Sequence, residues 1–287
     1  MIWKRFLLLL RARALCFPSH RADYAVVNEV LIRNINMKRV WNLACKSALA
    51  VCLATLAVPA WTESEDTASS SKAERSLPDL YAYVASDILE WSKPEPGVWV
   101  DLGAGSGGVG LAVASSKNRS AAASTIILLD PDATALTQAL KRGRRAGLSN
   151  RLVAVVGVAE KMPLPDKSVD LVFSRGSIWF WNDQVKGIRE IYRVLRPGGS
   201  AMLGGGLGSE YPEWARSEFM RRRHGHRNTD SPQAKEFARL RDPNTVRQWA
   251  KDAGISDFEV IGYGVLPPDD SRAASGIWLK FTKPKDE

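Results

Sequence analysis

The sequence predicts an α/β fold in which a doubly wound sheet of seven mostly parallel strands is covered by helices on both faces. From residue 77 onward, short and nearly continuous apolar runs alternate with longer segments of helical periodicity. Strands buried on both faces read as such runs, and their alternation with helices is typical of parallel sheets. A glycine-rich turn follows the first run, at residues 103–108. We expect a single domain over residues 77–283.

The elements can be placed in order along this domain. Apolar residues at helical spacing predict a first helix over 77–91, and the break at 92–97 contains two prolines and a glycine. The expected strands are 98–102, 125–129, 151–156, 169–174, 200–203, 258–263 and 276–281, and the expected helices are 108–117, 133–146 and 183–195. The connection over 204–243 is long for a loop, so we expect a helical cap near 214–221 that shapes a substrate pocket.

The basic residues are concentrated at the start of the chain, whose formal net charge is +9. Residues 1–60 contain nine Lys or Arg against two Asp or Glu, whereas residues 61–287 contain 31 against 29. A nucleic-acid-binding domain needs a basic patch of its own, and the run Arg221-Arg222-Arg223 is more typical of a solvated face. We therefore expect no nucleic-acid partner.

The segment 37–60 resembles a signal peptide or membrane anchor. Lys38-Arg39 precedes an apolar run without charges, and Val58-Pro59-Ala60 offers small residues for cleavage. We expect an exported, periplasmic or membrane-anchored protein, whose membrane contact, if it has one, is made by 37–60. A cytoplasmic N-terminal helix is the alternative. Residues 61–76 are expected to be a polar linker, and residues 1–36 an upstream or disordered segment before a start at Met37.

Taken alone, the glycine turn fits two kinds of cofactor. Glycines let the backbone approach a ligand, and the following helix presents its N-terminal N–H groups to negative charge. The spacing Gly103-x-Gly105-x-x-Gly108 satisfies the dinucleotide fingerprint, and Asp130 stands 22 residues after Gly108. The turn therefore does not separate a nicotinamide-dependent oxidoreductase from other nucleoside-binding enzymes.

Five segments, taken in order, resemble the class I S-adenosylmethionine-dependent methyltransferases of the Rossmann-like, small-molecule type. They are 98–107 (VWVDLGAGSG), 129–133 (LDPDA), 159–174 (AEKMPLPDKSVDLVFS), 190–199 (EIYRVLRPGG) and 253–255 (AGI). The resemblance implies the fold given above, S-adenosyl-L-methionine as the cofactor, and a cofactor site at the carboxyl ends of the strands.

The resemblance also implies which residues form that site. Asp101 and the backbone of the turn would surround the methionine end, and Asp130 would accept hydrogen bonds from the ribose. Many relatives place an acid at position 158 for the adenine amino group, whereas this chain has Val158. Adenine would then depend on apolar packing, the backbone near Ala159, and Glu160. The implied cofactor residues are Asp101, Gly103, Ala104, Gly105, Ser106, Gly107, Asp130, Pro131, Val158, Ala159, Glu160, Ser174 and Arg175.

The loop over 174–183 would lie beside the transferable methyl group. Methyl transfer is an in-line displacement, so the enzyme mainly holds the reactants in near-attack geometry, and a base helps only if the nucleophile must lose a proton. Trp179 and Trp181 could attract the sulfonium by cation–π interaction, or could, with Phe180, simply pack the next helix. Arg175 could orient an anionic substrate or pair with a structural acid. The candidate substrate residues are Arg175, Trp179 and Trp181, and no motif identifies a catalytic residue.

The leading functional prediction is an S-adenosylmethionine-dependent methyltransferase (EC 2.1.1.-) with a small-molecule acceptor. The alternative is an exported, non-catalytic binding protein that retains the fold, which Val158 and the export-like segment motivate and the retained Asp101 and Asp130 oppose. A nicotinamide-dependent oxidoreductase is the third reading. No metal site is expected, because His224 and His226 stand in a polar run without nearby carboxylates.

Overall fold

The computed structural model describes residues 76–224, 231–267 and 269–286. The predicted segments 1–36 and 37–60, the linker up to residue 75, and His226 lie outside these residues. Within the described residues, no helix is both long enough and apolar enough to cross a membrane.

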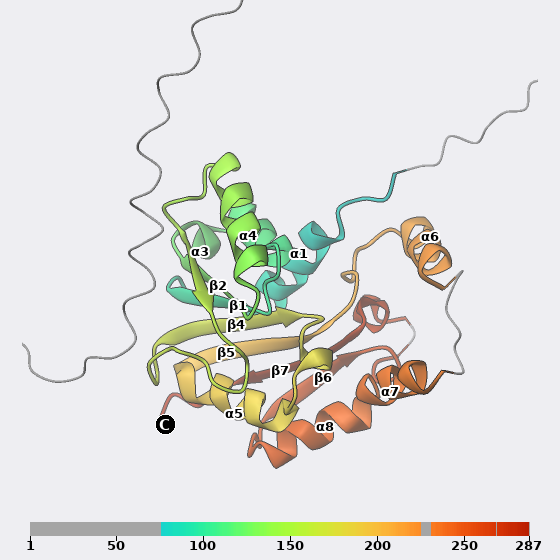
Figure 1. Ribbon diagram of the computed structural model, residues 1–287. Coiled ribbons are helices and arrows are strands. Elements are labelled where there is room, and N and C mark those ends of the chain that lie inside the picture. The colour runs from blue at the N-terminus through green and yellow to red at the C-terminus, as the bar shows by residue number, and fades with distance from the viewer. Residues whose placement is uncertain (1–75, 225–230, 268, 287) are drawn as a thin grey trace, which may run out of the picture. The chain divides into compact units, whose positions relative to one another are not determined.

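Seven strands form one sheet in the order β3-β2-β1-β4-β5-β7-β6 (Figure 1). The strands are β1 (Val98–Leu102), β2 (Thr125–Asp130), β3 (Leu152–Val156), β4 (Val169–Arg175), β5 (Leu195–Gly205), β6 (Phe258–Gly262) and β7 (Ile277–Thr282). Strands β1 to β5 pair in parallel, whereas β7 runs antiparallel to both β5 and β6. The predicted seven-stranded, mostly parallel sheet is confirmed, and its strand order reverses between β1 and β4.

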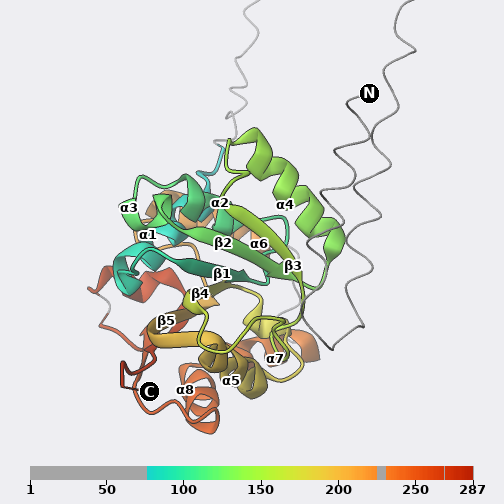
Figure 2. The same ribbon diagram turned by 90° about the vertical axis from the view of Figure 1, so that its left-hand side faces the viewer.

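Helices cover both faces of the sheet. The helices are α1 (Leu80–Ser92), α2 (Gly108–Ser115), α3 (Arg119–Ala122), α4 (Ala133–Arg145), α5 (Gln184–Val194), α6 (Glu213–His224), α7 (Pro232–Leu240) and α8 (Pro243–Asp252). Figure 2 shows α4 beside β2 and β3, with α5 and α8 on the opposite face. Successive strand residues point to opposite faces, so Trp99 enters the core under α1 and α2 while its neighbour Val100 enters the core over α5 and α8.

Side-chain caps set the helix starts. The Asp79 side chain accepts a hydrogen bond from the Tyr81 N–H, so α1 begins at Leu80 and not at residue 77. No expected element covers α7 and α8, yet each begins with a capping residue, Ser231 or Asp242, followed by proline.

Two further predictions need correction or refinement. Strand β5 starts at Leu195, directly after α5, and not at the predicted residue 200. The β4–β5 register shifts between Val169 and Leu171. The predicted helix near 214–221 is present as α6. Its apolar side packs near the start of α1, where the Tyr83 and Tyr211 rings meet edge to face at 5.3 Å.

Candidate cofactor and active site

The turn after β1 is held against the end of β2. The N–H groups of Gly103 and Ala104 both donate to the Leu129 carbonyl oxygen, at 2.7 and 3.1 Å. The Gly105 N–H donates to Asp130 Oδ2 at 2.8 Å. Two predicted parts of the site therefore meet at the carboxyl edge of the sheet, where ligands of open α/β sheets bind.

The glycines of this turn are required for different reasons. A Cβ atom at Gly103 would lie 2.1 Å from Ser177 Cβ, and one at Gly107 would lie 2.9 Å from Ala139 Cβ. Gly105 has a φ of +51° and nothing within 4 Å of its would-be Cβ. Gly103 and Gly107 thus make room for protein side chains, whereas Gly105 faces open space.

Asp130 keeps acceptor capacity for a ligand. Its Oδ1 accepts from the Asp132 N–H and its Oδ2 from the Gly105 N–H, both at 2.8 Å. A carboxylate offers about four lone-pair sites, so these two bonds leave others to accept from hydroxyl groups. The side chain is part of a cavity wall. This arrangement fits the ribose of S-adenosylmethionine.

That cavity measures about 470 Å³ and lies between the ends of β1, β2 and β4 and the connection after β3. Eight of the predicted site residues form part of its wall, namely Gly103, Asp130, Pro131, Val158, Ala159, Glu160, Arg175 and Trp181. The structure therefore brings together residues that are up to 78 positions apart in the sequence.

The structure places Asp101 behind the turn and not on the cavity wall. Its side chain is 2% exposed, and its Oδ2 accepts from the Gly110 N–H at 2.7 Å. Burial raises the pKa of Asp101 to about 7; the Gly110 hydrogen bond lowers it, and the charge of Asp130 raises it. In this position the carboxyl group supports the first turn of α2.

Five other predicted cofactor residues also lie off the cavity wall, namely Ala104, Gly105, Ser106, Gly107 and Ser174. Ala104 is buried, and Ser106 is exposed with its carbonyl accepting from Arg142 at 2.8 Å. Ser174 is fully buried, with its hydroxyl 2.6 Å from the Ser177 hydroxyl. The structure therefore assigns these residues packing and turn geometry.

The connection after β3 supplies the wall near Asp130. Val158 is 42% exposed and lines the cavity, as an apolar surface. Glu160 Oε1 accepts from the backbone N–H groups of Asn182 and Asp183, at 2.6 and 3.2 Å. Glu160 thus ties this connection to the loop that follows β4.

The three aromatic residues after β4 occupy different places. Trp179 is 5% exposed and packs against Trp249 of α8, with ring centroids 6.3 Å apart, so the packing interpretation holds for this residue. Trp181 lines the cavity. Phe180 also lines it, is 70% exposed, and meets Phe237 of α7 at 5.3 Å.

Arg175 lies on the cavity wall at the end of β4. Its Nε donates to the Gly206 carbonyl at 2.8 Å, and its guanidinium carbon stands 5.5 Å from the centroid of the Tyr81 ring. The backbone carbonyl and the aromatic face hold the positive charge at the edge of the cavity.

Reasoning from the sequence missed Ser177, whose hydroxyl lies at the centre of the site. Its Oγ is 2.9 Å from the Leu102 carbonyl oxygen and 3.1 Å from Trp181 Nε1. The available signal was its position in a polar, glycine-containing loop at the carboxyl end of a central strand. A single serine in such a loop has no motif that distinguishes it.

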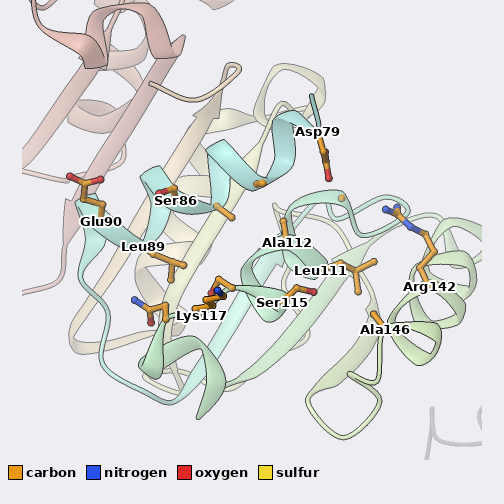
Figure 3. Close-up of a pocket in the computed structure, with 15 residues that line it drawn as sticks. Asp79, Ser86, Leu89, Glu90, Leu111, Ala112, Ser115, Lys117, Arg142 and Ala146 are labelled. Carbon is orange, nitrogen blue, oxygen red and sulfur yellow. The ribbon is translucent and has the colours of Figure 1, made fainter. Parts of the chain in front are cut away.

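A larger cavity of about 760 Å³ lies between the helices α1, α2 and α4 (Figure 3). Asp79 and Arg142 lie toward one end of it, and Glu90 and Lys117 toward the other. None of the predicted site residues lines it. It lies away from the strand ends, so we assign the site to the smaller cavity.

Comparison with known proteins finds methyltransferases among those similar to this chain. Residues 100–203 match the family model described as a methyltransferase domain. A solved structure from Methanococcus maripaludis, described as an S-adenosyl-L-methionine-dependent methyltransferase, is 30% identical with a TM-score of 0.56. The match covers 72% of this chain and 87% of that one.

Curated relatives are methyltransferases as well. The 2-methyl-6-phytyl-1,4-hydroquinone methyltransferase of Arabidopsis thaliana is 29% identical over 63% of this chain and 46% of the relative. The dimethylglycine N-methyltransferase of Parasynechococcus marenigrum is 34% identical over 42% of this chain and 44% of the relative. The chain spans less than half the length of these curated relatives. The strand order, the Asp130 site and the match over most of a solved relative together show that the chain belongs to the class I S-adenosylmethionine-dependent methyltransferase family.

Proposed function

We propose that the protein transfers the methyl group of S-adenosylmethionine to a small-molecule acceptor. The observation that carries the proposal is the position of Asp130, an acid with spare acceptor sites beside a 470 Å³ cavity at the strand ends. Pockets of this size, with apolar walls and a few polar groups, suit small ligands.

Different residues of the cavity would bind different parts of the cofactor. Asp130 would accept from the ribose hydroxyls, and Val158 and Ala159 would pack the adenine ring. The aromatic face of Trp181 would favour a cation, by about 0.5–2 kcal/mol. Bound S-adenosylmethionine supplies an electrophilic methyl group on its sulfonium sulfur. The protein then contributes by holding the acceptor in line and excluding water. An amine acceptor with a free lone pair needs no base, whereas a hydroquinone acceptor must also lose a proton, to solvent or to a base.

The acceptor side of the cavity combines apolar and positive groups. Phe180 and Trp181 offer aromatic surface, and Arg175 offers a fixed positive charge. The names of the relatives specify a phytyl hydroquinone in one case and dimethylglycine in another. We propose an acceptor of one of these two classes, a substituted hydroquinone or a small amine with a carboxylate.

Calorimetric titration of the full chain with S-adenosylmethionine and S-adenosylhomocysteine tests the cofactor site. We expect micromolar binding that Asp130→Ala weakens by about tenfold or more. Asp132→Ala is the matched control, because this acid caps α4 and lies off the cavity wall; it lowers the melting temperature and keeps the affinity. Absence of binding by folded wild-type protein would refute the cofactor assignment.

Transfer of labelled methyl groups tests the reaction itself. A hydroquinone and dimethylglycine are the first acceptors to assay. Turnover with either acceptor supports the proposed enzyme activity and identifies the class of acceptor. Tight cofactor binding without turnover over a broad acceptor set would favour the non-catalytic binding protein, which the apolar residue at position 158 motivates.

We further propose that residues 37–60 direct export or anchor the protein, with Met37 as its start. The basic and apolar order of that segment supports this. N-terminal sequencing of the native protein and its fractionation between membrane, exported and cytoplasmic pools test the proposal. Peptides from before Met37, or a wholly cytoplasmic pool, would contradict it.

A further inference from the structure

We infer that Ser177 is a positioning residue that fixes Trp181 as a wall of the cofactor cavity. Three hydrogen bonds meet at its hydroxyl: to the Leu102 carbonyl at 2.9 Å, to Trp181 Nε1 at 3.1 Å and to the Ser174 hydroxyl at 2.6 Å. The inference rests on the proposed function, because it gives that cavity its shape.

The chemistry of the partners sets the direction of each bond. A carbonyl oxygen only accepts and an indole N–H only donates. Ser177 must therefore donate its single proton to Leu102 and accept from Trp181. Its remaining lone pair accepts from Ser174, so the Ser174 hydroxyl is the donor in that pair. The Ser177 hydroxyl is saturated with protein partners, which leaves it a structural role beside the cavity.

This arrangement joins two walls of the cavity. Leu102 ends β1 at the glycine turn, and Trp181 belongs to the loop after β4. Ser177 lies against the turn so closely that a Cβ atom at Gly103 would come within 2.1 Å of it. The glycine turn, Ser177 and Trp181 thus form one contiguous unit.

The Trp181 ring is also limited on its other side. A Cβ atom at Gly187 of α5 would lie 2.6 Å from the Trp181 ring. The ring therefore lies between α5 and the cavity, and the hydrogen bond from its N–H group to Ser177 holds it in one orientation. Loss of that bond leaves a half-buried indole N–H without its acceptor, and the ring must move to satisfy it.

Nuclear magnetic resonance of the indole N–H groups, together with calorimetry, tests the inference on the full chain. Trp181→Phe assigns the Trp181 indole signal. In Ser177→Ala we expect this signal to shift. We also expect the Kd for S-adenosylhomocysteine to rise roughly three- to tenfold in Ser177→Ala and in Trp181→Phe. The double variant should bind about as weakly as the weaker-binding single variant, because both substitutions remove the same hydrogen bond between Trp181 and Ser177.

Ser124→Ala is the control for a general loss of stability. Ser124 is buried and also makes two hydrogen bonds, with the Gly97 N–H and the Ser120 carbonyl. Its loss should lower the melting temperature without changing the Kd. An unshifted Trp181 signal in Ser177→Ala overturns the inference whether or not the ligand binds. Additive effects, or an equal effect of Ser124→Ala on the Kd, overturn it as well. Failure of the wild type to bind, with the signal still shifting, refutes the proposed function instead.

Discussion

At the scale of single residues, Gly103 and Ser177 form a matched pair. The positive φ of Gly103, +72°, and the 2.1 Å approach of its would-be Cβ to Ser177 both require glycine. A neighbouring protein side chain thus explains why position 103 is glycine. Of Gly103, Gly105 and Gly107, only Gly105 faces open space. A glycine motif in the sequence does not reveal this difference.

We expect Gly103→Ala to lower the free energy of unfolding by at least about 2 kcal/mol, from backbone strain and overpacking. Ser177→Gly removes the clashing Cβ atom, so the double variant should lose less than the two single losses combined. Gly105→Ala is the comparison, with backbone strain of about 1 kcal/mol and no clash. Urea unfolding of the wild type and of these four variants measures the losses. Additive losses would contradict the pairing.

A second residue-scale prediction concerns the buried Asp101. Its folded-state pKa, about 7, lies above the ordinary value of 3.8. The folded protein therefore binds this proton more tightly than the unfolded chain does, and stability falls as pH rises from about 4 to 7. Asp101→Asn lacks this dependence. We expect the melting temperature of the wild type, relative to this variant, to fall over that range and level off above it.

Asp87, whose pKa burial raises to about 6, is present in both proteins and cancels in this comparison. A difference in melting temperature that stays constant between pH 4 and pH 8 would mean that Asp101 is ionised in the folded state.

At the scale of elements, α5 holds the connection that carries Val158 to Glu160. Arg193 donates to the carbonyls of Leu164 and Met162, each at 3.0 Å, and pairs with Glu190 and Asp166. Glu190 in turn accepts from the Met162 N–H at 2.9 Å. Two side chains of α5 thus secure a connection that contains no helix of its own.

We expect Arg193→Ala to cost about 1–3 kcal/mol of unfolding free energy, because it leaves carbonyl groups and a carboxylate without their partner. Arg193→Lys should recover less than half, since one ammonium cannot reproduce the planar set of donors. Urea unfolding measures the stability, and calorimetry shows whether cofactor affinity falls with it. Full recovery by lysine would show that charge alone suffices.

Several elements were predictable because local patterns decide them. Strand β1 has the expected bounds, β2, β3, β4, β6 and α4 differ by one residue at one end, and β7 is shifted by one residue. Helix α7 was missed although Ser231 and Pro232 are a standard helix start, because the apolar residues that follow are few. Asp130 and Val158, which the family resemblance implied, line the cavity. Asp101 and Trp179 are buried and do not line it. The sequence did not indicate this, since burial in a core depends on distant segments that no local pattern reports.

At the scale of the whole molecule, β7, the last strand along the sequence, occupies an interior position in the sheet. β7 lies between β5 and β6 and contributes the buried side chains of Trp278, Leu279 and Phe281. A chain ending at residue 275 should therefore lose cooperative thermal unfolding and become insoluble. A chain ending at residue 283 keeps all of β7 and should melt as the full chain does. Circular dichroism and solubility compare them; a well-folded 275-residue chain would contradict this account.

The interior position of β7 also determines the order in which the strands can pair during synthesis. Synthesis proceeds from the N-terminus at about 5–20 residues per second, so β1 to β5 are complete well before β7 is made. In the finished sheet β6 has no strand neighbour other than β7. It therefore has no partner strand until the segment that contains β7 has been synthesised. In the interval between the synthesis of β6 and that of β7, we expect the unpaired edge of β6 to be open to pairing with another chain.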